Sequence, residues 1–498
     1  MRSWIVLLGV VGCGGAPAVM QPPPKASDKP VPVLTTTQLA TTEPVEQEAP
    51  LPPKRRFPVA WHSAKAGKDT PAGNAIAFRL DGSVVVMGQG EAEAWAGTPK
   101  KKLARLYPHF VASLDAGGKA EWARTIDVGN GWTKGVAAGP DGSVIVTGSF
   151  EKKLTIAGKV VATSAGETDV FVARFERDGK LAWAVRAGGA ALDLAYGVAV
   201  AEDGTSYVVG SISGAAKFGI LETRHMGDRD AFVARFGPKG EAEWVSTAGG
   251  KDSDTASAVT LTKRAVCVTG DFSGVAKFQA VTLTMPPPEP NKVANPSNVF
   301  VVCHGLSGDV LWGERLGTHT SFDRGWDIAS LSDGSVVVTG DHSERSFVAR
   351  YSSGGKLMWQ RQATGSSTAR GVIALPGDEV LVSTYLVGGD FVAQGRKRSL
   401  SVTARGSDTV LAHYTADGEV LALGRIAGEK GRSGDERDGD EIEMARMAVS
   451  STGRVAMTGR AWGKAVFEAG DLLVPTKDVI TGSSSRDLIV VMLDALTP

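Results

Sequence analysis

A phenylalanine followed twelve residues later by a tryptophan recurs five times along this chain. The first three copies are spaced 61 residues apart. Self-similarity at a fixed period is the signature of a repeat architecture, so it constrains the fold before any single segment is assigned. The pairs are Phe110/Trp122, Phe171/Trp183, Phe232/Trp244, Phe300/Trp312 and Phe347/Trp359.

Each repeat reads as four strand-like segments in a fixed order. An alternating apolar segment, such as residues 197–201, is followed by a tight turn that is Asp-Gly in four of the repeats. Asp-Gly between two apolar runs is a strong hairpin signal. A second strand, a third strand that starts at the phenylalanine and a fourth that holds the tryptophan follow. Seven second strands are expected to end at Gly88, Gly148, Gly210, Gly270, Gly340, Ser383 and Gly459.

Seven units of four strands predict an all-β fold, a seven-bladed β-propeller of four-stranded antiparallel blades over residues 57–498. The last unit has no room for its fourth strand, because its tryptophan would fall beyond Pro498. An orphan fourth strand, residues 58–61, precedes the first unit. We therefore expect the N-terminal strand near Trp61 to complete the last blade and close the ring, which leaves few strand edges exposed.

The tryptophan segments, for example residues 115–122 and 178–183, resemble the tryptophan-docking motif of quinoprotein-like propellers. The succession Val-Thr-Gly, Asp-x-Phe-Val-Ala-Arg-Phe and Trp is similar to the SBBP-type repeats of bacterial lipoproteins and cell-surface proteins. This resemblance covers residues 57–498 and implies the propeller fold. It does not identify an activity, because propellers host unrelated functions.

The first residues of the chain predict an export signal. One arginine is followed by a short apolar run that ends in Val10-Val11-Gly12-Cys13 and is too short to span a bilayer. This ending resembles the lipobox of bacterial lipoproteins, which implies that residues 1–12 are a signal peptide and that Cys13 is lipidated. An ordinary secretory signal with a chance cysteine is the alternative. Gly14 replaces the aspartate that the resemblance links to inner-membrane retention, so we expect an outer-membrane anchor, on the periplasmic side or at the cell surface.

Residues 13–56 are expected to form a disordered tether behind the lipidated cysteine. The segment is rich in Pro, Thr and Ala and has no hydrophobic periodicity before the propeller begins. Such a composition buries too little apolar surface to offset the entropy of ordering.

Binding residues are expected on the propeller face that carries the long second-to-third and inter-blade loops. The position just before each first strand should lie at the mouth of the central channel, where a mixed polar and aromatic ring could hold a small polar ligand or a peptide. The alternative is a hydrated channel without a ligand. The channel-mouth residues are Asn74, Lys134, Tyr196, Trp326, Asp327, Arg370 and Arg446.

Several kinds of site are disfavoured. Lysine plus arginine and aspartate plus glutamate are equal at 54 each, so no basic field favours nucleic acid. The seven histidines lack zinc-ligand spacing, and no cofactor fingerprint or catalytic constellation is visible, so we expect no metal, cofactor or enzymatic activity. The acidic segment 429–443 does not follow a calcium-loop pattern and is expected to be a solvated loop.

Two cysteines fall on adjacent strands of the fourth unit. Cys267 lies on the second strand and Cys303 on the third, and an oxidising compartment would allow a disulfide if their registers match. The intervening loop hides that register, so two buried thiols remain an open alternative.

Together these features predict a monomeric, lipid-anchored propeller of the bacterial cell envelope that binds a protein, peptide or glycan partner without catalysis. A quinoprotein-like enzyme and a scaffold for outer-membrane protein assembly are the alternatives.

Overall fold

The computed structural model describes residues 59–66, 72–90, 109–287, 296–318, 321–428, 441–462, 464–468, 480–481 and 487–495. The chain divides into two units, Met1–Leu51 and Pro52–Pro498, and every described residue belongs to the second. The expected signal peptide, Cys13, the tether and most of the acidic segment lie outside the described residues. The described part is all-β and offers no helix capable of crossing a bilayer.

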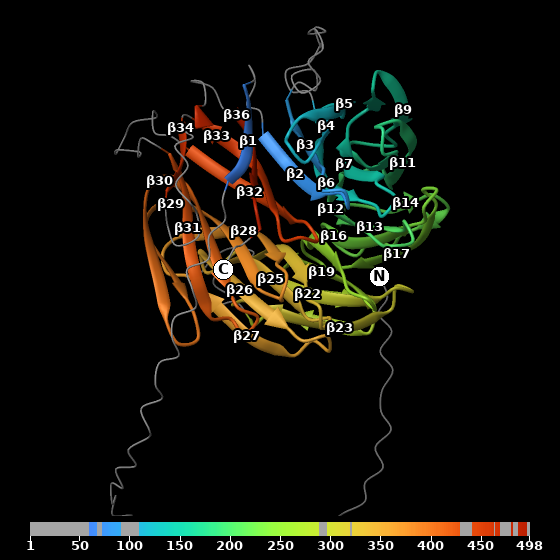
Figure 1. Cartoon of the computed structure of the whole chain (residues 1–498). Helices are drawn as coiled ribbons and strands as arrows, with labels where there is room; N and C mark the ends of the chain where they lie inside the picture. The colour runs from blue at the N-terminus through green and yellow to red at the C-terminus, as the bar shows by residue number, and fades with distance from the viewer. Residues whose placement is uncertain are drawn as a thin grey trace, which may run out of the picture. The chain divides into compact units, whose positions relative to one another are not determined.

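Within the described residues, strands pair antiparallel in sets of four, which we number as repeats 1 to 7 (Figure 1). Repeat 1 comprises β2 (Ala72–Phe78), β3 (Val84–Gln89), β4 (His109–Leu114) and β5 (Ala120–Asp127). Repeat 2 comprises β6 (Trp132–Ala138), β7 (Val144–Phe150), β10 (Asp169–Phe175) and β11 (Leu181–Gly189). Repeat 3 comprises β12 (Asp193–Val200), β13 (Ser206–Ile212), β16 (Asp230–Phe236) and β17 (Ala242–Ala248). Repeat 4 comprises β18 (Thr255–Leu261), β19 (Ala265–Phe272), β22 (Asn298–Gly305) and β23 (Val310–Leu316).

The remaining repeats keep this order. Repeat 5 comprises β24 (Arg324–Ser330), β25 (Val336–His342), β26 (Arg345–Tyr351) and β27 (Leu357–Gln362). Repeat 6 comprises β28 (Ser367–Ala374), β29 (Val380–Gln394), β30 (Ser399–Tyr414) and β31 (Val420–Gly428). Repeat 7 comprises β32 (Glu441–Val449), β33 (Val455–Trp462) and β36 (Asp487–Leu493), and β36 pairs with β1 (Val59–Ala66).

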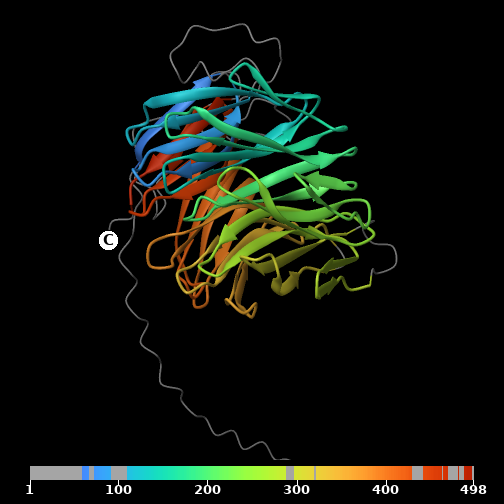
Figure 2. The same cartoon turned by 90° about the vertical axis from the view of Figure 1, so that its right-hand side faces the viewer.

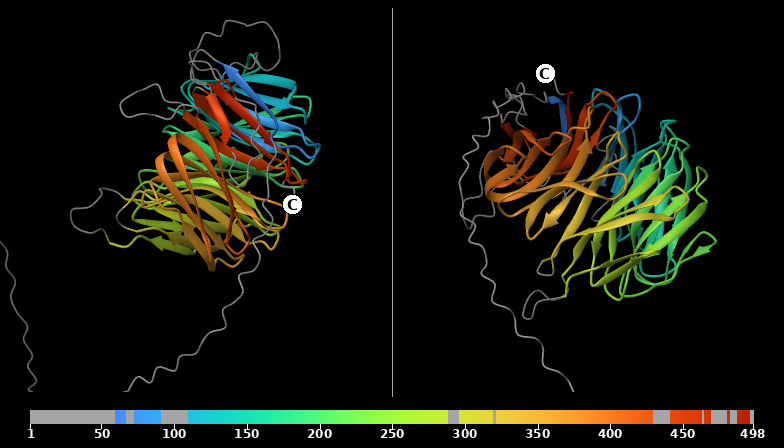
Figure 3. Two further views of the ribbon diagram at one scale, coloured as in Figure 1. Left: turned by 60° about the vertical axis from the view of Figure 1, so that its left-hand side comes forward. Right: turned by 90° about the horizontal axis from the view of Figure 1, so that it is seen from below.

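The first strands lie next to one another in sequence order. Each first strand contacts the first strand of the following repeat, and β32 contacts β2. Figures 2 and 3 show the sheets following one another from blue to red, with the red strands of repeat 7 beside the blue strands of repeat 1. The chain of contacts therefore returns to its start.

The tryptophans of the recurring pairs connect each sheet to the next. The indole N–H of Trp183 donates to the carbonyl of Pro238, 2.9 Å away in the third-to-fourth turn of repeat 3. Gly240 in that turn has φ +89°, and a Cβ there would lie 2.9 Å from the indole ring, so only glycine fits beneath it. Equivalent bonds join Trp122 to Arg177, Trp244 to Leu306, Trp312 to Ser353 and Trp359 to Ala416.

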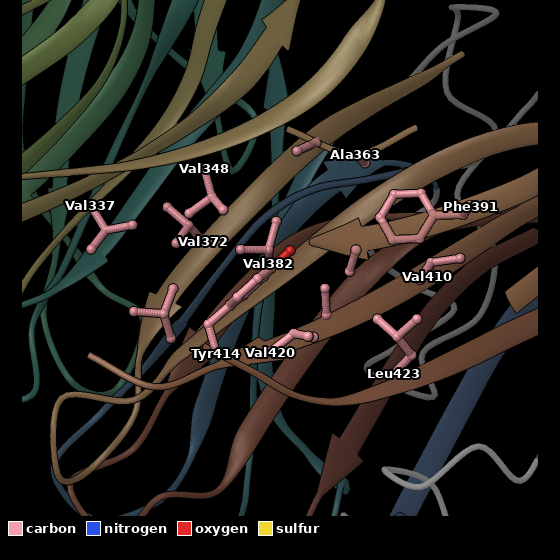
Figure 4. Close-up of a cluster of buried hydrophobic side chains, with 14 of the residues drawn as sticks. Val337, Val348, Ala363, Val372, Val382, Phe391, Val410, Tyr414, Val420 and Leu423 are labelled. Atoms are coloured by element: carbon pink, nitrogen blue, oxygen red, sulfur yellow. The ribbon is translucent and has the colours of Figure 1, made fainter. Parts of the chain in front are cut away.

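Apolar side chains fill the space between neighbouring sheets. Figure 4 shows one such cluster, to which Val337 and Val348 of repeat 5 and Val372, Val382 and Val410 of repeat 6 contribute. All five are buried. Alternating strand residues thus serve two interfaces, one on each face of their sheet.

Extra strand pairs in the second-to-third connections, which we call straps, reach back to the outer strand of the preceding repeat. For example, the strap of repeat 3 pairs with β11 of repeat 2. The short straps are β8 (Lys153–Ile156) with β9 (Lys159–Thr163), β14 (Ala216–Phe218) with β15 (Leu221–Glu222), β20 (Val275–Phe278) with β21 (Val281–Thr284), and β34 (Lys464–Glu468) with β35 (Ile480–Thr481). In repeat 6 the long ends of β29 and β30 take this place.

Repeat 5 has no strap. Its second and third strands are joined by Ser343 and Glu344 alone, both with positive φ (52° and 61°), as in a type I′ hairpin turn.

The two cysteines of repeat 4 form a disulfide. Cys267 on β19 lies directly opposite Cys303 on β22, with 4.0 Å between the Cα atoms, and the two sulfur atoms are bonded. Both residues are buried.

Candidate functional site

A β-bulge near the start of each first strand builds the candidate site. In repeat 1, Gly73 and Ala75 pair with Gly88 and Met87, so Asn74 is the extra residue. A bulge leaves one residue outside the ladder and redirects its side chain, and bulges are common beside functional sites. The bulged residues of repeats 1 to 6 are Asn74, Lys134, Tyr196, Ser257, Trp326 and Arg370.

The seventh first strand also carries a bulge with one extra residue. Glu443 pairs with Arg460 and Arg446 with Thr458, so two residues of β32 face one of β33. Arg446 follows this bulge, at the position that Asp327 holds in repeat 5.

In six of the seven repeats a glycine of the second strand lies opposite the bulge. A Cβ on Gly148 would lie 2.0 Å from the carbonyl oxygen of Trp132, which crosses it at the bulge of repeat 2. No side chain fits at that distance. In repeat 6 the residue at this register is Thr384, opposite Ala369, so the expected strand end at Ser383 was one residue too early.

A cavity of about 280 Å³ lies among the bulges of repeats 1, 2, 5, 6 and 7. This volume is close to the lower end of the range for small-molecule sites, about 300–1,000 Å³. The lining residues are Ala72, Gly73, Asn74, Lys134, Trp326, Arg370, Glu443, Arg446, Gly459 and Arg460.

The cavity wall carries more positive than negative side chains. Lys134, Arg370, Arg446 and Arg460 face it together with a single carboxylate, Glu443. Glu443 is held by Arg460, whose guanidinium lies 2.7 Å from it, and Arg370 is 3.9 Å away. Arg446 donates to the backbone carbonyl of Arg370 at 3.3 Å.

Lys134 is the least compensated of these cations. Within the described part of the chain, its ammonium group has no hydrogen-bond or ion-pair partner. Burial lowers the pKa of Lys134, the charges of Arg446 and Arg370 lower it further, and Glu443 opposes them. The cation is therefore held where an anion would stabilise it.

Trp326 forms the aromatic part of the wall. The Arg370 guanidinium carbon lies 4.5 Å from the centre of its ring, a cation–π contact. Its indole N–H donates to the carboxylate of Asp341, whose pKa burial raises to about 6. The ring and Arg370 are thereby fixed relative to each other.

The structure brings five of the seven expected channel-mouth residues together around the cavity and excludes two. Asp327, which follows the bulge, accepts the backbone N–H groups of Ile328 and Val372, each at 3.0 Å, and does not line the cavity. Tyr196 does not line it either. Arg229, Asp271 and Arg324 are the charges that act on Tyr196, and burial raises its pKa.

Two charged lining residues were missed by the sequence argument. Glu443 precedes the bulge of β32, and Arg460 lies one residue beyond the Thr-Gly at the end of the second strand of repeat 7. The signal was present in the repeat pattern, because residues just after that glycine face the same bulge from the neighbouring strand.

Comparison with known proteins gives likenesses to solved structures only. No family model matches the chain, and no curated protein sequence matches it. The chain is similar to the WD40 domain of Neurospora crassa Pan2 at 13% identity, over 76% of this chain and 93% of that chain, with a TM-score of 0.41. It is similar to a protein from Lactobacillus plantarum at 14% identity, over 76% and 95%, with a TM-score of 0.39. Virginiamycin B lyase from Staphylococcus aureus is similar at 10% identity, over 72% and 94%, with a TM-score of 0.31.

The chemistry of the cavity favours binding an anion. Three guanidinium groups and one ammonium group supply hydrogen-bond donors, and Asn74 adds an amide whose N–H group is already donated to Thr133. Guanidinium and ammonium groups are the side chains that recognise carboxylate and phosphate oxygens. Among the described residues no cluster of three or more His, Cys, Asp or Glu side chains could hold a metal ion.

Proposed function

We propose that this protein is a lipid-anchored, seven-bladed β-propeller of the cell envelope that binds a small anionic ligand in its central cavity without transforming it. The antiparallel pairing of seven strand sets, the pairing of β1 with β36 and the return of contacts from β32 to β2 support a ring closed by the N-terminal strand. Cys13 supplies the proposed anchor, and Cys13→Ala should release the protein from the membrane fraction.

The observation that carries the binding role is the convergence of four cations from repeats 2, 6 and 7 on one cavity. Like charges that are held together in a buried site repel one another and lower the stability of the fold. Their presence here is therefore best explained by a role in binding. The one carboxylate in the wall, Glu443, is already held by Arg460. A ligand with two or more negative charges would neutralise the excess.

The cavity opens toward the longer connections. Its residues come from the beginnings of the first strands and from the end of β33, and the second-to-third connections start at the same ends of the second strands. These connections can therefore contact a larger molecule that carries the anionic group, such as a protein, peptide or glycan partner.

Isothermal titration of the full chain with pyrophosphate, citrate and glucose tests the proposal. We expect saturable binding of one or both anions, none of glucose, and a loss of about tenfold or more in affinity on Lys134→Met. The same substitution should raise Tm, because it removes a buried, uncompensated charge. Lys239→Met, which removes an exposed lysine from a turn, is the matched control and should change neither quantity.

Absence of anion binding, or equal affinities for wild type and Lys134→Met, would overturn the proposal. A bound chromophore or stoichiometric calcium in the purified protein would instead favour a quinoprotein-like enzyme.

A further inference from the structure

Among the described residues, the outer strand of repeat 4 lacks a contact that the structure shows for the outer strands of repeats 1, 2, 3, 5 and 6. In those five repeats the residue five positions after the tryptophan position pairs with a strap of the next repeat. The pairs are Asp127 with Thr155, Gly188 with Lys217, Gly249 with Lys277, Thr364 with Val392 and Ala427 with Val466. The equivalent residue of repeat 4 is Gly317, and repeat 5, which would supply its strap, has only the two-residue turn.

The backbone of Gly317 shows the missing bond directly. In repeat 3, Gly249 and Lys277 exchange two hydrogen bonds, with N–H to O=C distances of 2.8 and 3.3 Å. Within the described residues the N–H of Gly317 has no partner. Its carbonyl accepts from the Arg315 side chain at 3.2 Å.

The side chains around Gly317 are correspondingly open. Glu314 and Arg315 are exposed, whereas the equivalent Val185 and Arg186 of repeat 2 are half-buried. Phe322 is 54% exposed, whereas its equivalent Leu192 is half-buried. The N–H of Thr318 donates to the carboxylate of Asp323, the residue that follows Phe322, at 3.0 Å.

We propose that this open edge, residues 314–318 with Phe322, binds an extended segment of a partner protein, which adds a strand where the other repeats carry a strap. An exposed strand edge is a template for pairing, and main-chain hydrogen bonds with side-chain pockets are a recurrent mode of peptide recognition. The inference is independent of the cavity and of its ligand.

The straps define the chemistry of the segment. In the straps of repeats 2, 3 and 4, the residue that follows the pairing residue (Thr155, Lys217 or Lys277) is apolar and buried. These residues are Ile156, Phe218 and Phe278. Phe218 packs 5.0 Å from Phe232, and Phe278 packs 4.9 Å from Phe300, between ring centres. A partner segment therefore carries an aromatic or branched apolar residue next to its pairing residue, and lies antiparallel to β23.

A fluorescent peptide with the sequence of residues 274–284, the strap of repeat 4, is the probe. We expect saturable binding to the full chain by fluorescence anisotropy, weakened about tenfold by Phe322→Ser and abolished when Phe278 of the peptide is replaced by serine. Ile220→Ser, at an exposed apolar residue in a strap turn, is the control and should leave binding unchanged.

A second variant tests the same edge without removing an apolar residue. Residues 273–286 replace Ser343 and Glu344, which gives repeat 5 a strap that covers the edge. The peptide should no longer bind this variant, whose Tm should equal or exceed that of the wild type. The proposal is overturned if the peptide does not bind the wild type, or if it binds the Phe322→Ser variant with unchanged affinity. A dimer of the wild type that the added strap abolishes would assign the edge to a second copy of the chain, which also overturns it.

Discussion

Repeats 3 and 4 share one strand order and one tryptophan contact, yet different interactions hold them together. In repeat 3, Arg235 on the third strand lies 3.9 Å from Asp203 of the Asp-Gly turn. The equivalent arginine of repeat 5 pairs with its turn aspartate at 2.6 Å. Repeat 4 has Cys303 at the arginine position and Thr-Lys-Arg in place of the Asp-Gly turn. A disulfide thus occupies the place of an ion pair, in the repeat whose outer edge is open.

The disulfide is expected to produce the largest effect in this comparison. The double substitution Cys267→Ala and Cys303→Ala opens a loop with a sequence separation of 36 residues. For a loop of this size the expected loss is about 3–4 kcal/mol in the free energy of unfolding. Urea denaturation with and without reductant measures it.

Arg235→Gln in repeat 3 is the matched change, because it removes the ion pairs with Asp203 and Glu243 and the hydrogen bond to the Leu306 carbonyl from the same structural position. Arg235 is partly exposed to solvent, so this substitution should cost at most about 1 kcal/mol. Equal losses for the two variants would show that the disulfide adds nothing beyond the ion pair that it replaces.

The two repeats also differ in a buried pair of side chains at their junctions with the next repeat. In repeat 3, carboxylate oxygens of Asp230 and Asp254 lie within 2.7 Å of the point where a Cβ on Gly249 would be. At the equivalent Gly317, the pair is Asn298 and Asp323. Burial raises the pKa of Asp254 to about 8, and the charges of Asp230 and Asp271 add to this rise while two backbone N–H donors oppose it.

Asp323 behaves in the opposite way. Burial acts to raise its pKa, but hydrogen bonds from His342, Ser321 and Ser343 outweigh burial, and the pKa is lowered. His342 Nδ1 lies 3.0 Å from the carboxylate. At the repeat 4 junction, Asn298 replaces one of the two aspartates and His342 lies nearby. Asp323 therefore favours its charged form, whereas Asp254 favours its protonated form.

Asparagine substitutions at these two positions should change stability in opposite directions. The folded state holds the Asp254 proton more tightly than the unfolded chain, so stability falls as the pH rises from about 4 to about 8. Asp254→Asn removes that fall, and its Tm should exceed that of the wild type by an amount that grows between pH 5 and pH 8. Asp323→Asn should lower Tm at pH 7, with a deficit that shrinks as the pH falls below about 4. Differential scanning calorimetry across this range decides the matter, and Tm shifts of one sign in both variants would refute the contrast.

The sequence predicted local features well because each depends on residues close together in the chain. The four strands of a repeat and the Asp-Gly turns follow from short-range pattern and turn chemistry. The aspartates that begin the third strands accept turn N–H groups, for example Asp169 from Ala165 at 2.7 Å.

Features that depend on contacts between repeats could not be predicted in this way. No residue of β14 indicates that it pairs with β11 of the preceding repeat, because strand edges do not encode their partner. The register that joins Cys267 to Cys303 depended on the length of an inserted loop. Matching positions in the repeats predicted seven channel-mouth residues, of which five line the cavity. The sequence did not separate Trp326 from Asp327, because the bulge sends these consecutive side chains to different environments.

The smallest expected effect concerns the tryptophans themselves. Trp244→Phe and Trp312→Phe remove the same indole N–H and similar apolar area, so the difference between the two reports on the carbonyl that each leaves behind. The carbonyl of Leu306 also accepts from Arg235 at 3.0 Å, whereas Ser353 receives only Trp312 among the described residues. We expect a loss of about 1 kcal/mol for Trp312→Phe and about half of that for Trp244→Phe in urea denaturation. Equal losses would mean that water hydrogen-bonds to the Ser353 carbonyl as well as Arg235 does to the Leu306 carbonyl. The tryptophans would then stabilise the contact with the next repeat through packing alone.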